Sequence, residues 1–219
     1  MTYSFGADSL DISETANAWK SRYKPILDWD RMFADGDWDY LNDASEAARY
    51  ALIAGYVHRR PTPIKLLDVG CGAGLLCRYL DHGRIVYSGI DLSEAAIGQA
   101  RETFGEADFS VSDITQYQPP AGQTFDVIVF NEVLPHVDDP VGSLDRYMGF
   151  LQPSGMMIIS TYQNVNTKSN AAMFTGLLEE ALTNGRFRSL TRCEVVTFEK
   201  GLKWRIDVIA DAGGTNADD

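Results

Sequence analysis

A glycine-rich loop follows the first short apolar run of the sequence, residues 64–69. It is preceded by Asp68-Val69 and reads Gly70-Cys71-Gly72-Ala73-Gly74. Glycine permits a tight turn and lets a ligand approach the backbone closely. The dinucleotide fingerprint G-x-G-x-x-G would need a third glycine where this chain has Leu75. The loop therefore indicates a nucleotide-like ligand without matching that fingerprint. Taken alone, a simple tight turn explains it equally well.

Two acids follow the next strand-like segments. Asp91 ends the apolar run 84–90 and lies 21 residues beyond Gly70. A carboxylate at this place can accept hydrogen bonds from both hydroxyls of a ribose, with Leu92 beside it. Asp113 follows the weaker run 109–111 and can accept from an adenine amino group, with Ile114 packing on the ring. The alternatives are a helix cap for Asp91 and a turn aspartate for Asp113.

The strongest strand signal is Phe-Asp-Val-Ile-Val-Phe at 125–130, and it leads into the segment Asn131–Val137. In open parallel sheets, ligands bind beyond the carboxyl ends of the strands near the switch point. We therefore expect Asn131 and its neighbours to lie where the reacting end of the ligand is held.

Alternating strand and helix signals surround these loops and predict a parallel sheet with helices on both faces. A helix is expected from Asp43, which can form a capping box with Glu46, and it should end before Pro61. Lys200-Gly201 separates two runs in the pattern of a hairpin. The expected strands are 64–69, 84–90, 109–111, 125–130, 156–161, 193–198 and 202–209. The expected helices after the first are 75–80, 93–104, 139–151 and 170–184, with a turn at 153–155.

These motifs, in this order, resemble those of the class I S-adenosylmethionine-dependent methyltransferases, and in particular the members that act on small molecules. The resemblance covers about residues 64–161. It includes Leu151-Gln152-Pro153-Ser154-Gly155, where the family often has a glycine in place of Ser154. It implies an α/β domain with a Rossmann-like, seven-stranded, mostly parallel sheet that ends in an antiparallel hairpin. It also implies a helical N-terminal cap over residues 1–60 and a core over 61–210, while the small and polar residues at the C-terminal end predict a disordered tail over 211–219.

The resemblance implies S-adenosylmethionine as the cofactor, bound by the glycine loop, Asp91 and Asp113. In this family a nucleophile attacks the methyl group of the sulfonium in line, and the enzyme holds donor and acceptor in place and excludes water. His136 is the best candidate for a general base because its ordinary pKa lies near neutrality. The alternative is a histidine that only supports its loop. Glu132 is the second candidate.

The charge of the chain bears on its partners. With 19 basic and 31 acidic residues the net charge is −12, and residues 102–145 contain nine acids and no lysine or arginine. Nucleic-acid binders usually carry a basic footprint, so DNA and RNA are not expected as partners. The acidic stretch fits a site for a cationic ligand, although a solvated surface explains it too.

Other composition features set further limits. The 219-residue chain shows no signal peptide and no apolar run long enough to span a bilayer, and three cysteines are too few for a disulfide framework. We therefore expect a cytoplasmic protein without a membrane partner, either a monomer or a homodimer. His58, His82 and His136 do not cluster in the sequence, so no metal site is predicted, although a magnesium site assembled in space stays open.

The N-terminal region is rich in aromatic residues, among them Trp29, Phe33, Trp38 and Tyr40. They could form a lid over the cofactor and shape an acceptor pocket, or they could be plain core contacts. Arg49 on the expected helix could bind the cofactor carboxylate, and a surface ion pair is the alternative.

The sequence therefore predicts methyl transfer to a small molecule, with a hydroxyl of a sugar, natural product or metabolite favoured because His136 offers a base. The alternatives are methylation of a small amine, an aminopropyl transferase of the same fold that uses the decarboxylated cofactor, a nicotinamide-dependent dehydrogenase, and a cofactor-binding protein without catalysis. Leu75 in the glycine loop disfavours the dehydrogenase.

Overall fold

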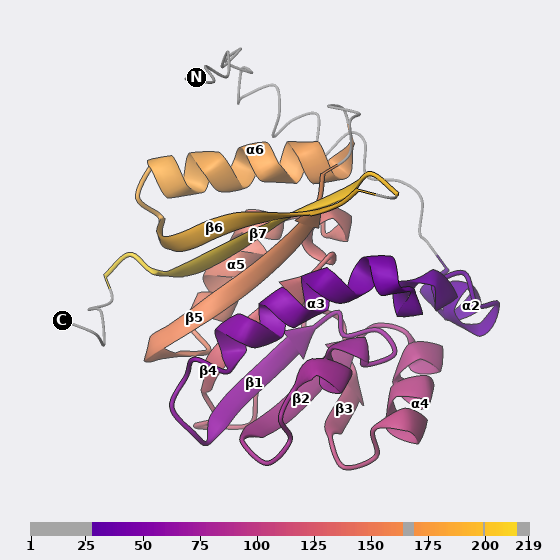
Figure 1. The fold of residues 1–219 in the computed structure, drawn as a ribbon. Coiled ribbons are helices and arrows are strands. Elements are labelled where there is room, and N and C mark those ends of the chain that lie inside the picture. Colours follow the sequence, from indigo (N-terminus) through magenta and orange to yellow (C-terminus); the bar gives the residue numbers. More distant parts are fainter. Residues whose placement is uncertain (1–27, 164–168, 199, 214–219) are drawn as a thin grey trace.

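The structure is a computed structural model that describes residues 28–163, 169–198 and 200–213. The expected cap before residue 28 and the expected tail beyond residue 213 lie outside these ranges. Figure 1 shows the architecture, a twisted sheet with helices packed on both of its faces.

The sheet contains seven strands in the spatial order β3-β2-β1-β4-β5-β7-β6. Strands β1 to β5 pair in parallel, whereas β7 runs antiparallel to both β5 and β6. The strands are β1 Ile64–Val69, β2 Ile85–Asp91, β3 Asp108–Val111, β4 Phe125–Asn131, β5 Leu151–Tyr162, β6 Phe187–Thr197 and β7 Leu202–Asp211. The predicted fold class, including the terminal antiparallel hairpin, is confirmed.

The order of the strands fixes where a ligand can bind. From β1 the chain proceeds outward through β2 to β3, and it then crosses back to place β4 on the other side of β1. The helices that follow β1 and β4 therefore diverge, and a crevice opens between the carboxyl ends of these two strands. The predicted glycine loop leaves β1 at this point, and the segment after Asn131 leaves β4 at the same point.

The helices cover the two faces of the sheet. The α-helices are α2 Trp29–Ala34, α3 Ala44–Val57, α4 Glu94–Thr103, α5 Pro140–Met148 and α6 Asn170–Thr183, and the 3-10 helices are η1 Asp39–Asn42, η2 Leu75–Tyr79 and η3 Leu134–His136. Alternate residues of one strand enter different cores, because side chains of a strand point to opposite faces. Val127 belongs to the core under α3 and α4, and Ile128 belongs to the core under α5 and α6.

Several predicted boundaries are wrong. The segment after the glycine loop is the 3-10 helix η2, because Gly74 is left-handed before it and Leu80 is extended after it. The expected turn at 153–155 is a bulge inside β5, whose register to β4 shifts between Leu151 and Met156. Helix α5 ends at Met148 rather than at Leu151, because Leu151 already pairs with β4. Strand β6 begins six residues before the expected 193.

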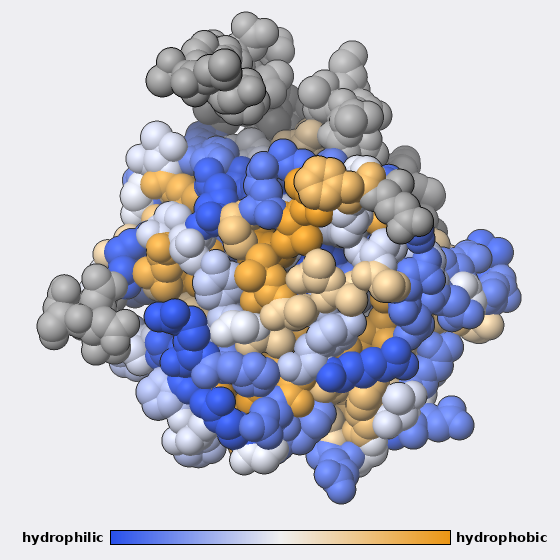
Figure 2. Space-filling model, in the orientation of Figure 1, coloured by the Kyte–Doolittle hydropathy of each residue, from blue (hydrophilic) through white to orange (hydrophobic). Residues whose placement is uncertain are grey.

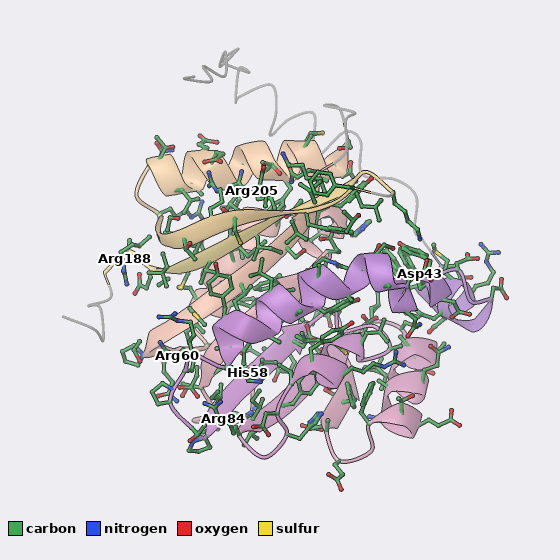
Figure 3. All side chains as sticks on the ribbon, in the orientation of Figure 1. Asp43, His58, Arg60, Arg84, Arg188 and Arg205 are labelled. Carbon is green, nitrogen blue, oxygen red and sulfur yellow. The ribbon has the colours of Figure 1, made fainter. Side chains whose placement is uncertain are left out.

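The predicted capping box of α3 is also wrong. Asp43 does occupy the N-cap position, but its side chain makes no capping hydrogen bond and instead binds Lys200 Nζ at 2.7 Å. The carboxylate of Glu46 pairs with Arg49 at 2.8 Å. At the other end of the helix, His58 Nε2 accepts from the backbone N–H of Asp81, which ties α3 to the loop before β2 (Figure 3).

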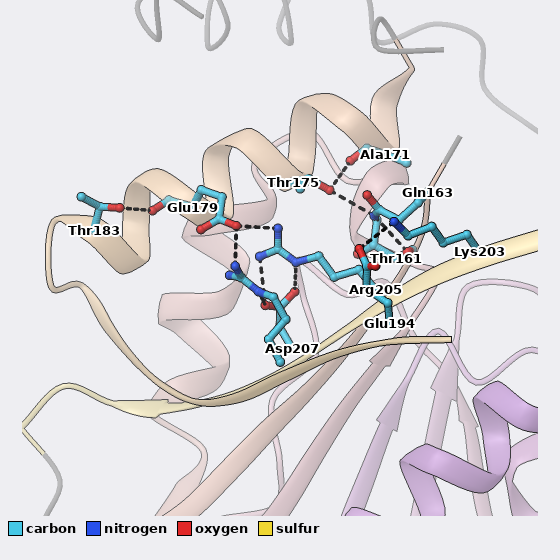
Figure 4. A network of polar contacts seen from close by, with 11 residues as sticks. Thr161, Gln163, Ala171, Thr175, Glu179, Thr183, Glu194, Lys203, Arg205 and Asp207 are labelled. Atoms are coloured by element: carbon cyan, nitrogen blue, oxygen red, sulfur yellow. Dashed lines mark hydrogen bonds and ion pairs between the residues drawn. The ribbon is translucent and has the colours of Figure 1, made fainter. Parts of the chain in front are cut away.

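A network of ion pairs joins α6 to the terminal hairpin (Figure 4). The carboxylate of Asp207 on β7 is 1% exposed and accepts from Arg192 and Arg205 at 2.6–2.9 Å. Arg205 also binds Glu179 of α6 at 2.6 Å. Two carboxylates thus compensate two guanidinium groups; Asp207 and Arg205 are buried, whereas Glu179 and Arg192 are 44% and 38% exposed.

The surface shown in Figure 2 intersperses apolar and polar residues over one face of the molecule. Within the described ranges, no helix has the length and apolar character needed to cross a bilayer.

Candidate active site

A cavity of about 810 Å³ lies at the carboxyl ends of the parallel strands. Every site residue predicted from the sequence except Gly74 lines it: Arg49, Asp68, Gly70, Cys71, Gly72, Asp91, Leu92, Asp113, Ile114, Asn131, Glu132 and His136. Gly74 lies behind the wall, with φ at 74°, and a Cβ there would come within 2.9 Å of the Phe109 ring. The turn therefore requires a glycine at position 74, and contact with a ligand does not.

The glycine loop is held against β2 by its own backbone. The N–H groups of Gly70 and Cys71 both donate to Ile90 O, at 2.8 and 3.0 Å. Gly70 has φ at 68°, and a Cβ there would lie 2.6 Å from the side chain of Val133. The loop therefore brings β1, β2 and the segment after β4 into close contact at the cavity wall.

Asp68 gives the cavity a buried carboxylate with spare capacity. Its Oδ2 accepts from the Tyr87 hydroxyl at 2.7 Å, and its Oδ1 has no hydrogen-bond partner among the described residues. Burial raises the pKa of Asp68 to about 7, the hydrogen bond from Tyr87 lowers it, and the nearby charge of Asp91 raises it. A buried acceptor of this kind fits a cationic donor such as the ammonium group of an amino acid.

The titration of Asp68 should be visible in the stability of the ligand-free protein. Its folded-state pKa is raised from the ordinary 3.8, so its contribution is fully present below about pH 4 and is lost as the pH rises through about 7. We expect the free energy of unfolding of the wild type, relative to Asp68→Asn, to decline over that window. Urea denaturation at a series of pH values measures the difference. A difference that stays constant between pH 4 and 7 contradicts the prediction.

Asp91 is held in place by backbone donors. Its Oδ2 accepts from Gly72 N at 2.8 Å and its Oδ1 accepts from Ser93 N at 2.9 Å. Burial raises the pKa of its carboxyl, and the hydrogen bonds from the backbone oppose that shift. The helix-cap alternative is excluded for Asp91, because Ser93 itself caps α4 by accepting from Ala96 N. Each carboxylate oxygen keeps one unused acceptor site at the cavity.

Asp113 serves as a turn residue and also lines the cavity. Its Oδ1 accepts from the backbone and the hydroxyl of Thr115, at 2.6 and 2.7 Å. Ile114 packs against the core below, and its carbonyl accepts from the Tyr147 hydroxyl. Leu92, 54% exposed, lines the same part of the cavity.

Arg49 is not a surface ion pair, because only 1% of its side chain is exposed. Its Nη1 donates to Asn131 Oδ1 at 2.7 Å and its Nη2 to Glu46 at 2.8 Å. Its guanidinium also lies over the rings of Tyr50 and Trp204, at 4.6 and 5.4 Å from the centroids. Its Nε is buried without a hydrogen-bond partner among the described residues.

Glu132 is engaged by its neighbours. It is the one described residue other than glycine with a positive φ, 66°. Its Oε1 accepts from Ser160 Oγ at 2.6 Å, and its Oε2 accepts from Tyr162 N at 2.7 Å. Burial raises the pKa of its carboxyl, and Arg49 at 3.8 Å opposes that shift. Through these contacts the Glu132 side chain fixes the loop after β4 against β5.

His136 is the last residue of η3 and lines the cavity. Its ring meets the ring of Trp29 edge to face, at 5.2 Å between centroids. Burial lowers its pKa below the ordinary 6.5, so at neutral pH the imidazole is mainly uncharged.

Four rings form a row along the cavity wall, and we call it the aromatic row: Phe33, Trp38, Trp29 and His136. Successive ring centroids lie 6.1, 5.9 and 5.2 Å apart, and Trp29 is stacked on Trp38. Phe33 approaches the glycine loop, since a Cβ on Gly72 would lie 3.1 Å from its ring. The row therefore extends from the glycine loop to His136.

Helix α2, which carries two of these rings, is fastened to α4. Asp30 accepts from Ser93 Oγ at 2.7 Å and from Ala95 N at 3.0 Å, at the N-terminus of α4. Gln99 donates to the carbonyl of Phe33 at 3.1 Å. The sequence alone does not reveal the roles of Asp30, Gln99 and Ser160, because no local pattern marks a contact between segments so far apart in the chain. In the described parts of the chain, no three His, Cys, Asp or Glu side chains come together as a metal site would require.

Comparison with known proteins agrees with this geometry. A family model described as a methyltransferase domain matches residues 40–198, which is most of the chain. The ubiquinone biosynthesis O-methyltransferase of Saccharophagus degradans is 28% identical over 183 residues, covering 79% of this chain and 69% of that protein. The protein of that name from Bradyrhizobium diazoefficiens is 33% identical over 117 residues, covering 52% of this chain and 45% of its own length.

Solved structures share the fold at low sequence identity. The N-methyltransferase NodS from Bradyrhizobium japonicum WM9, in complex with S-adenosylhomocysteine, has a TM-score of 0.69 and 18% identity, covering 89% of this chain and 98% of NodS. The plantazolicin methyltransferase BpumL has a TM-score of 0.66 and 16% identity, covering 91% of this chain and 98% of BpumL. The [4+2]-cyclase SpnF also matches, with a TM-score of 0.63, so the fold alone does not fix the reaction. The family match, together with the cavity at the switch point, shows that the chain belongs to the class I S-adenosylmethionine-dependent methyltransferases and uses S-adenosylmethionine as its cofactor.

Proposed function

We propose that this enzyme transfers the methyl group of S-adenosylmethionine to a hydroxyl of a small molecule. The observation that carries the proposal is one cavity that contains both the cofactor loop and a mainly neutral His136. The O-methyltransferase relatives named above support a hydroxyl acceptor. When bound, the cofactor supplies an electrophilic methyl group on a positively charged sulfur.

The residues that would hold the cofactor divide by chemistry. Asp91 would accept from the ribose hydroxyls, and Asp113 would accept from the adenine amino group beside Ile114 and Leu92. The unpartnered Oδ1 of Asp68 would accept from the ammonium group of the methionine part. The side-chain donor left for the carboxylate of the methionine part is Arg49 Nε, which has no hydrogen-bond partner among the described residues. The carboxylate partner favours S-adenosylmethionine over the decarboxylated cofactor of an aminopropyl transferase.

Calorimetry tests this part directly. We expect S-adenosylhomocysteine to bind the purified protein. We expect decarboxylated S-adenosylmethionine to bind more weakly, because it has no carboxylate for Arg49 to bind. A protein that binds neither molecule would refute the proposed function. Stronger binding of the decarboxylated form would favour aminopropyl transfer instead.

His136 would act as the base that accepts the proton of the attacking hydroxyl. We expect His136→Ala to lower kcat by about 100-fold, at the lower end of the range for acid–base catalysis, because a lowered pKa makes a weaker base. The neutral form is the active one, so the wild-type rate should rise with pH to a midpoint below 6.5 and then level off. Turnover of labelled cofactor with an accepted hydroxyl substrate measures both effects.

Two further variants separate catalysis from packing against Trp29. His136→Asn keeps a polar side chain in the row and should lose as much activity as His136→Ala. His82 lies outside the cavity, and its Nε2 contacts Cys77 O, so His82→Ala should retain the wild-type rate. Full activity in His136→Ala would remove the base assignment and leave methyl transfer intact.

An amine acceptor is the second candidate, supported by the acidic lining of the cavity. An amine must be neutral to attack the methyl group. The rate of amine methylation should therefore rise with pH through the pKa of the amine itself. A hydroxyl acceptor that uses His136 should show no such climb at alkaline pH. Acceptor pairs that share one ring and differ only in hydroxyl or amine, assayed at neutral and alkaline pH, distinguish the two.

A further inference from the structure

We propose that the acceptor is a planar molecule that is uncharged or cationic, and that it binds against the aromatic row. This inference rests on the proposed function and specifies its substrate class. It follows from three properties of the wall between the glycine loop and His136: its rings, its charges and a buried donor.

The rings supply flat contact area next to the predicted base. Trp29 and Trp38 both line the cavity, and their planes are inclined by only 23°. Trp29 and His136 meet edge to face, so a flat molecule lying along the row would have its reacting atom near the imidazole. Stacking on such rings contributes about 0.5–1.5 kcal/mol beyond the area buried.

The position of the row is set before any ligand arrives. Asp30 and Gln99 fasten α2 to α4, and Phe33 packs against the glycine loop. A wall that is already ordered costs the ligand less conformational entropy on binding.

The charges select against anions. Seven carboxylates line the cavity, against a single guanidinium among the described lining residues: Asp39, Glu46, Asp68, Asp91, Asp113, Glu132 and Asp138, with Arg49. Arg49 is already compensated by Glu46 and lies 3.8 Å from Glu132. Asp39 lies between Trp38 and Tyr40 in the chain, and Asp138 lies two residues beyond His136. A carboxylate or phosphate on the acceptor would therefore meet like charge and find no further cation.

A buried donor in the row suits a neutral oxygen. Trp38 Nε1 has no hydrogen-bond partner among the described residues. An indole N–H only donates, so it would be satisfied by a hydroxyl or carbonyl oxygen of the acceptor.

The test uses probes that share a ring and differ in charge. Tyrosol is neutral, tyramine is cationic and para-hydroxyphenylacetate is anionic; tryptophol, tryptamine and indoleacetate form a second set. Each is titrated by calorimetry at neutral pH into protein saturated with S-adenosylhomocysteine. We expect the neutral and cationic probes to bind at least about tenfold more tightly than the anionic one. Cyclohexylethanol, which cannot stack, should bind more weakly than tyrosol.

Variants assign the effect to residues. Trp38→Leu should weaken the binding of tyrosol and tryptophol by about tenfold and change the affinity for S-adenosylhomocysteine little. Phe198→Leu, at a side chain that is 93% exposed and outside the cavity, is the control and should change neither affinity. Asp39→Asn should reduce the difference in affinity between the anionic probe and the neutral one.

Three results would overturn the inference: an anionic probe that binds as tightly as its neutral counterpart, equal binding of cyclohexylethanol and tyrosol, or no binding of any ring probe at millimolar concentration. Each of these leaves cofactor binding intact, so the proposed function would stand. Loss of S-adenosylhomocysteine binding in the wild type is a separate outcome, and it would overturn both.

Discussion

Asp91→Ala is expected to weaken the binding of S-adenosylhomocysteine by about 100- to 1,000-fold. The carboxylate offers about four acceptor sites, and the backbone of Gly72 and Ser93 occupies two of them. The remaining two are available to the ribose hydroxyls. Hydrogen bonds to a charged group contribute about 1.5–3 kcal/mol each, and two such bonds at the lower end account for the expected loss. Calorimetry measures the dissociation constant.

Asp126→Ala is the matched control. Asp126 is also a strand-end aspartate that accepts a backbone N–H, that of Lys65 at 2.8 Å, but it lies near the start of β4 and outside the cavity. We expect this variant to bind S-adenosylhomocysteine like the wild type. Equal affinities in Asp91→Ala and Asp126→Ala would remove Asp91 from the cofactor site.

Asp207→Ala is expected to lower the free energy of unfolding by about 3–5 kcal/mol. The side chain of Asp207 is 1% exposed and that of Arg205 is 8% exposed, so removal of the carboxylate leaves a buried guanidinium with Glu179 as its remaining ionic partner among the described residues. Breaking a buried pair costs more than the pair contributes, because one charge stays in the interior uncompensated. Urea denaturation followed by circular dichroism measures the change.

An exposed pair on the same hairpin provides the comparison. Lys203 and Glu194 lie 2.7 Å apart, with side chains 40% and 53% exposed, and Glu194→Ala should cost at most about 1 kcal/mol. Replacing both members of the buried pair, as Arg205→Met with Asp207→Leu, should recover part of the stability lost in Asp207→Ala. If Asp207→Ala is no more costly than Glu194→Ala, the network does not stabilise the hairpin.

The sequence predicted the architecture well because its signals are local. Ser93 was expected to cap a helix and does so, and the run 125–130 was expected to be a buried strand and forms β4. Asp139 before Pro140 was expected to start a helix, and its side chain accepts from Gly142 N. Each of these depends on neighbours within a few positions of the chain.

Errors arose where a distant segment competes for the same group. Asp43 occupies the N-cap position of α3, but its carboxylate forms an ion pair with Lys200, which is 157 positions away. Residues 153–155 carry turn chemistry, yet pairing with β4 on both sides keeps them within a strand. Local propensity is a weak prior that tertiary contacts override.

The sequence by itself determined which chemistry the site offers. The spacing from the glycine loop to Asp91, and the acids and amides at later strand ends, follow from residue order, since parallel strands place their carboxyl ends at one edge. Only the tertiary structure decided how those groups are used. Burial of Arg49 beside Asn131, the unpartnered oxygen of Asp68 and the stacking of Trp29 on Trp38 depend on segments up to 82 positions apart. Desolvation and hydrogen-bond geometry arise from packing in three dimensions, and no local pattern encodes them.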